Sequence, residues 1–154
     1  MSETERICGQ MQSAFSGGAW HGPALLELLA GVGVSQAAAR PIPGGHTIWE
    51  IVLHLAATQM LLLRRLDGDA TGLTPEEDWR PMPGATEENW QSTLQTLNER
   101  EEELRHAVLG YAEERLTAPL IEGGSSSYNN FHGHVQHTLY HSGQISLLKK
   151  ASTA

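Results

Sequence analysis

Cysteine and long apolar runs are scarce in this chain. The single cysteine, Cys8, excludes an internal disulfide and is expected to pack as a small hydrophobic residue. No apolar run approaches the ~20 residues that a bilayer crossing needs, so a membrane protein is not expected. The first ten residues, MSETERICGQ, lack the basic and apolar segments of a secretion signal. We therefore expect a protein of the cytoplasm.

Basic residues are also few. The chain has 10 Lys and Arg against 18 Asp and Glu, which gives a formal charge of -8. Because such a chain repels phosphate backbones, nucleic-acid binding is not expected. An acidic small-molecule substrate would need a local positive centre, which a metal ion provides. The acidic run Glu101 to Glu103 is interpreted as a solvated helix face.

Helical periodicity dominates what is present. A length of 154 residues with 40% hydrophobic residues predicts one domain, residues 1–154, with a single core. Four long helices are expected: Glu3 to Phe15, Thr47 (as cap) to about Leu66, Thr86 (as cap) to near Gly110, and from a cap at Asn129 or Asn130 to the end. The linker from about Asp67 to Ala85 holds three prolines and is long for a bundle connection. With no convincing strand, the predicted fold is all-α, a four-helix bundle with a long crossover between the second and third long helices.

The strongest pattern lies in Phe131 to Lys150, FHGHVQHTLYHSGQISLLKK. Read as a helix, it places His137 and His141 one turn apart, on a stripe that continues through Ile145. Both imidazoles should then point inward, where their lone pairs need partners. Two interpretations are open at this point: core histidines satisfied by hydrogen bonds, or two ligands of a divalent metal ion.

A third histidine favours the metal interpretation. His54 lies on the flank of the apolar arc of the second long helix, where a packed helix would meet it. Two ligands from one helix and one from another fix three corners of a tetrahedron and leave the fourth open, as in catalytic sites. Three imidazoles suit zinc and nickel, and also iron and copper.

The sequence resembles the DinB-like (YfiT-like) superfamily of metal-binding four-helix bundles over nearly its whole length. The resemblance is carried by AWHGPALLELLAG, by RPIPGGHTIWEIVLHLAA and above all by VQHTLYHSGQISLLKK. It implies that His54, His137 and His141 form a metal triad. It also implies a metal-dependent hydrolase or a transferase that uses a low-molecular-weight thiol.

Other polar residues near these motifs have open roles. Glu50, one turn before His54, is the candidate general base; it would fix the tautomer of His54 or accept a proton, and a solvent-facing carboxylate is the alternative. His134 shares the face of His141 but lies about 10.5 Å from it along the helix, too far to bind the same ion, so it is either a pocket wall or a partly exposed residue. Gln144 either orients a ligand or bonds a neighbouring helix.

Two functional hypotheses follow from these patterns. One is a metalloenzyme of the cytoplasm that acts on a small molecule, with a low-molecular-weight thiol as a candidate. The other is a non-enzymatic bundle that binds a metal or a small molecule. A homodimer is expected for a small bundle of this kind. His21, beside Trp20, could line the mouth of a cleft.

Overall fold

Helices make up most of the computed structural model, which describes residues 1–152. The four long helices are α1 (Glu3–Phe15), α4 (Ile48–Leu66), α6 (Glu87–Leu109) and α7 (Ser127–Ala151). Shorter elements connect them: α2 (Leu25–Leu29), α3 (Val34–Ala38), α5 (Pro75–Asp78) and the 3₁₀ turn η1 (Glu113–Arg115). Within residues 1–152 there is no strand, only an isolated bridge between Pro119 and Ser126.

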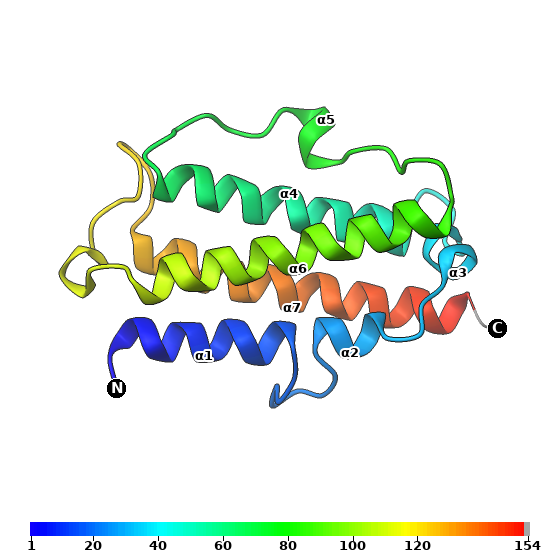
Figure 1. Ribbon diagram of the computed structural model, residues 1–154, viewed down its shortest axis with the longest axis horizontal. Coiled ribbons are helices and arrows are strands. Elements are labelled where there is room, and N and C mark those ends of the chain that lie inside the picture. Colours follow the sequence, from blue (N-terminus) through cyan, green and yellow to red (C-terminus); the bar gives the residue numbers. More distant parts are fainter. Residues whose placement is uncertain (153–154) are drawn as a thin grey trace.

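The long helices lie side by side, with the crossover on the outside (Figure 1). α4 packs against α6 and α7, and α1 packs against the same two helices. α2 follows α1 along the length of α7 (Figure 1). The segment between α4 and α6 passes over the outer side of α4 (Figure 1). The predicted four-helix bundle with a long crossover is confirmed.

Side-chain caps explain where the helices begin. Thr47 accepts a hydrogen bond from the backbone N–H of Glu50, whose carboxylate reaches back to the N–H of Thr47, and this reciprocal cap satisfies two orphan donors. The last helix begins earlier than predicted, because Ser126 caps it by accepting from the N–H of Asn129. Asn130 is already inside the helix and donates to the carbonyl of Ser126. The cap expected at Asn129 or Asn130 is therefore wrong.

The apolar core forms two clusters, one toward each end of the bundle. Trp49 and Trp90, both fully buried, belong to the first cluster, and Met11 and Phe131 belong to the second. Along α4, α6 and α7, the residues between the two clusters include buried polar side chains. The histidines discussed below belong to this polar middle section.

Glu101 corrects one expectation from the sequence. It was placed on a solvated face, but it is 2% exposed. Its position at helical spacing from Leu97 and Leu104 directs it into the core. There the carboxylate accepts hydrogen bonds from Gln59 Nε2 at 2.8 Å and from His134 Nε2 at 2.9 Å. Both bonds are made to Oε2, and Oε1 has no hydrogen-bond partner within residues 1–152, so these partners offset part of the cost of burying the carboxylate.

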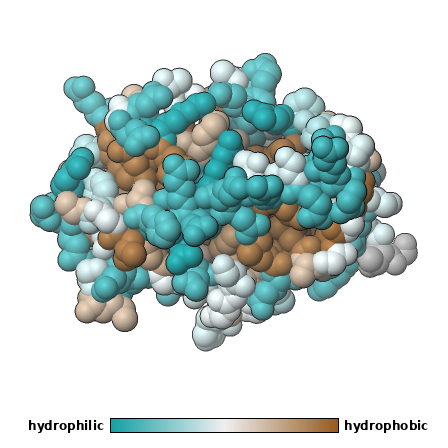
Figure 2. Space-filling model, viewed as in Figure 1, coloured by the Kyte–Doolittle hydropathy of each residue, from teal (hydrophilic) through white to brown (hydrophobic). Residues whose placement is uncertain are grey.

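Polar side chains cover much of the face shown in Figure 2, with apolar patches between them. None of the helices in residues 1–152 has the length and apolar character needed to span a bilayer.

Candidate metal centre

Three histidines from two helices meet in the middle of the bundle. His54 comes from α4, and His137 and His141 come from successive turns of α7. The Nε2 atom of His137 lies 3.0 Å from Nε2 of His54 and 3.0 Å from Nε2 of His141. Three nitrogens at about 2.1 Å from one tetrahedral ion would be about 3.4 Å apart. These two separations are slightly shorter than in a loaded site, and all three ligand nitrogens lie within 4.8 Å of one another, so a small adjustment of the rings would admit an ion.

The contact of His54 with the crossover fixes the tautomer of its ring. Its Nδ1 atom lies 2.9 Å from the backbone oxygen of Asp78 and 3.0 Å from a carboxylate oxygen of the same residue. Both oxygens are acceptors, so Nδ1 carries the hydrogen. In the neutral ring Nε2 then presents a bare lone pair to the other two histidines.

The hydrogen-bond partners of His137 and His141 on α7 also favour the tautomer with the hydrogen on Nδ1. His141 Nδ1 donates to the side-chain oxygen of Gln144 at 2.6 Å. His137 Nδ1 lies 3.5 Å from the hydroxyl of Thr58, which gives its own hydrogen to the carbonyl of Leu55. The Thr58 oxygen can therefore only accept, which favours the hydrogen on Nδ1 of His137. Gln144 takes the orienting role that was one of its two predicted alternatives.

The chemistry of this donor set fits a cation. With all three Nδ1 atoms protonated, three Nε2 lone pairs converge with no hydrogen between them. Such lone pairs repel one another unless a positive ion lies among them. No carboxylate or thiol belongs to the cluster within residues 1–152, so the donors are imidazoles alone. Zinc, nickel, copper and iron accept such ligands.

The surroundings of His137 and His141 favour the neutral, metal-binding form of these two imidazoles. Burial, together with the neighbouring His141, His54 and His134 as potential positive charges, lowers the pKa of His137 to about 4. Burial also lowers the pKa of His141, although its hydrogen bond to Gln144 opposes the shift. Neutral imidazole is the form that binds a metal ion.

The crossover supplies a wall of the site that the sequence did not reveal. The ring of Trp79 stacks on His54 at 4.0 Å with an interplanar angle of 3°. On the other side it stacks on His46 at 3.6 Å and 7°. Thr74-Pro75-Glu76-Glu77 matches the pattern of a capped helix start, so α5 had a sequence signal. No sequence pattern indicated that this segment would contact His54.

Glu50 is engaged away from the triad. Its carboxylate accepts from the N–H of Thr47 at 2.8 Å and from the guanidinium of Arg40 at 2.6 Å. Burial raises the pKa of Glu50, but the bonds from Thr47 and Arg40 outweigh it and the pKa is lowered. A hydrogen bond to His54 was one of the alternatives for Glu50, and Asp78 makes that bond instead. A catalytic role for Glu50 stays a prediction.

A cavity of about 310 Å³ leads to one member of the triad. It lies between α4 and α7, and His137 and His134 line it together with Thr58 and Arg65. His137 is partly exposed, whereas His54 and His141 are buried. His134 itself is 7% exposed, which rules out the partly exposed residue and supports the pocket wall. A small molecule would approach the triad from this side.

His21 and Cys8, which were also considered from the sequence, lie away from the triad. His21 is exposed and lines a separate cavity with Trp20, Ser13 and Leu139. Cys8 is buried, as expected, and burial raises the pKa of its thiol. Neither residue joins the metal centre.

Comparison with known proteins supports this picture at the level of family. The model of the DinB superfamily matches residues 19–144, a span that includes all three histidines and most of the bundle. No curated protein and no solved structure matches the chain.

Proposed function

The chain belongs to the DinB superfamily, and on that premise we propose that it is a metal-dependent enzyme acting on a small molecule. One observation carries the proposal: three Nε2 lone pairs, from His54, His137 and His141, converge within bonding range of a common cation. A divalent ion held there acts as a Lewis acid that lowers the pKa of a bound water or thiol.

The residues around the triad suit an open, reactive site. A non-enzymatic metal site would close its fourth position with a protein ligand, but no fourth His, Cys, Asp or Glu joins the cluster within residues 1–152. Instead, partly exposed His137 faces a cavity large enough for a small molecule. Asp78 and Gln144 hold two of the imidazoles in the required tautomer.

Thiol transfer makes the smaller chemical demand on this site. Free thiols have a pKa of about 8.5, so a modest shift yields the thiolate nucleophile. Water needs a far larger shift and usually a general base. The two carboxylates considered as a general base are already engaged. Glu50 is bound to Arg40 and Thr47, and Asp78 is hydrogen-bonded to His54. Transfer with a low-molecular-weight thiol is therefore the leading reaction, and hydrolysis is the second candidate.

A panel of assays on one preparation tests this proposal. Elemental analysis of the purified protein identifies the ion, and a chelator then removes it. Thiol-transfer and ester-hydrolysis substrates are assayed before removal, after removal and after the ion is restored. We expect thiol-dependent turnover that is lost with the metal and regained with it. Turnover that is indifferent to the metal would contradict the proposal.

The cytoplasmic location and the homodimer remain predictions from the sequence.

A further inference from the structure

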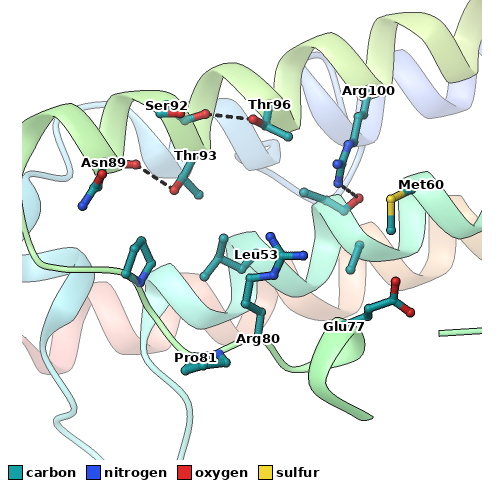
Figure 3. A pocket seen from close by; sticks show the side chains of 13 residues that line it. Leu53, Met60, Glu77, Arg80, Pro81, Asn89, Ser92, Thr93, Thr96 and Arg100 are labelled. Carbon is teal, nitrogen blue, oxygen red and sulfur yellow. Dashed lines mark hydrogen bonds between the residues drawn. The ribbon is translucent and has the colours of Figure 1, made fainter. Parts of the chain in front are cut away.

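A second cavity lies on another side of α4, enclosed by the crossover and α6 (Figure 3). Its volume is about 250 Å³, and no triad histidine lines it. Six of the residues that line it have apolar side chains: Leu53, Ala56, Ala57, Met60, Pro81 and Pro83. Two arginines, Arg80 from the crossover and Arg100 from α6, extend into the same space (Figure 3).

Neither arginine forms a direct ion pair with a carboxylate in residues 1–152. In the described part of the chain, residues 1–152, the exposed Arg80 guanidinium makes no hydrogen bond or ion pair. Arg100 donates one hydrogen bond, from Nη1 to the carbonyl of Ala56 at 2.7 Å. Its remaining N–H groups have no partner in residues 1–152. Both guanidiniums therefore retain donors that can face a ligand.

The one carboxylate that lines the cavity is already used. Oxygen Oε1 of Glu77 pairs with Arg64 at 3.1 Å, and Oε2 accepts from the N–H of Thr74 at 2.9 Å. Burial lowers the pKa of Arg100, the like charges of Arg80 and Arg64 add to this effect, and the carboxylate of Glu103 opposes it. A chain with a net charge of -8 thus keeps two guanidinium groups without a direct ion pair at this cavity. Glu77 and Glu103 act on Arg80 and Arg100 only as nearby charges.

We propose that this cavity binds a small organic carboxylate, with the anionic head between Arg80 and Arg100 and the apolar body on the floor of the cavity. A planar guanidinium matches a carboxylate with two parallel hydrogen bonds. The hydroxyls of Thr93 and Thr96 are donors to backbone carbonyls of α6, and the amide of Asn89 donates to the carbonyl of Gly84. The two arginines are therefore the charged donors that remain for recognition. The modest volume suits a small molecule rather than a nucleotide or a peptide.

The apolar floor distinguishes a carboxylate with an apolar chain from a bare anion. Hexanoate would bury its chain on the side chains of α4 and the crossover, and this burial adds favourable free energy. Inorganic phosphate has nothing to bury there. Hexanoate is therefore expected to bind at least tenfold more tightly than phosphate.

Calorimetric titration of the full chain with hexanoate tests the proposal. The protein is first freed of metal with a chelator, because a carboxylate would also bind an ion at the triad. We expect one saturable site, and we expect Arg80→Gln to weaken it at least tenfold through loss of a charged hydrogen bond. The matched control is Arg6→Gln, since Arg6 lies on α1 and is 62% exposed in a surface ion pair with Glu3. This control should bind as the unaltered chain does.

Three outcomes would overturn the proposal: no saturable binding of hexanoate, equal binding by Arg80→Gln and the unaltered chain, or equal binding of phosphate and hexanoate. Arg100→Gln is a second test, with its fold checked by circular dichroism because Arg100 also bonds α4. Metal content of Arg80→Gln is measured in parallel and should be unchanged. His137→Ala should still bind hexanoate, so failure of this proposal is distinguishable from failure of the triad.

Discussion

The carboxylate of Asp78 lies 3.0 Å from Nδ1 of His54, although the two residues are separated by the end of α4 and half of the crossover. A carboxylate behind a ligating imidazole fixes the ring and raises its basicity. The crossover is therefore part of the metal centre as well as a connection. Trp79, the next residue, seals the same imidazole by stacking on it.

Replacement of Asp78 tests this relationship. We predict that Asp78→Ala lowers metal affinity by about 10- to 100-fold, the usual effect of losing a carboxylate behind a metal ligand. Competition with a chelating dye measures the affinity. Asp69→Ala is the matched control, because Asp69 is in the same crossover but its carboxylate bonds Thr71 and no histidine. Equal affinities in the two variants would show that the contact does not matter.

Much of the fold followed from local patterns in the sequence. The caps at Thr47 and Thr86, the apolar stripes and the proline-rich linker predict the bundle and its crossover because each acts through neighbours along the chain. The pairing of His137 with His141 is equally local, one turn apart on one helix. These features need no knowledge of the tertiary structure.

The remaining features depend on contacts between distant segments. Asp78 meets His54 because the crossover folds back over α4, and no periodic pattern records where an irregular segment lies. Glu101 was misplaced because a run of three glutamates, of which it is the first, suggests solvent. Its partners Gln59 and His134 come from other helices. Glu50 matched the spacing for a contact with His54, but the cap and Arg40 hold it elsewhere.

The buried pair of Glu101 and His134 leads to a prediction about stability. Removing one partner leaves an uncompensated buried group, so Glu101→Ala should cost about 3–5 kcal/mol in the free energy of unfolding. Urea denaturation measures this cost.

The neighbouring Glu102 provides the control for that measurement, because it is exposed. Glu102→Ala should change stability by no more than about 0.5 kcal/mol. The double variant Glu101→Leu with His134→Leu should recover part of the loss, because no lone charge is left in the core. Similar stabilities for Glu101→Ala and Glu102→Ala would contradict the burial.

The lowered pKa of His137 predicts how metal binding depends on pH. Histidine ligands of ordinary pKa would lose their ion as pH falls through about 6.5. Because the pKa of His137 is lowered to about 4, protons compete with the metal at this ligand only at lower pH. The triad should therefore retain its ion at pH values where an exposed histidine site has lost it.

Two measurements check this pH dependence. Metal content is determined after dialysis across pH 4 to 8, and the His137 ring is titrated by NMR in the metal-free protein. We expect retention to persist below pH 6.5 and the ring to titrate well below its usual range. A His137 ring that titrates near 6.5 would count against the burial and the charge environment described here.

The most direct test of the metal centre is the metal content of single histidine variants, measured by elemental analysis after purification under identical conditions. His54→Ala, His137→Ala and His141→Ala should each lose most of the bound ion. His106→Ala, which removes an exposed histidine of α6, should retain it. Equal metal content in His137→Ala and His106→Ala would show that the three histidines do not hold the ion.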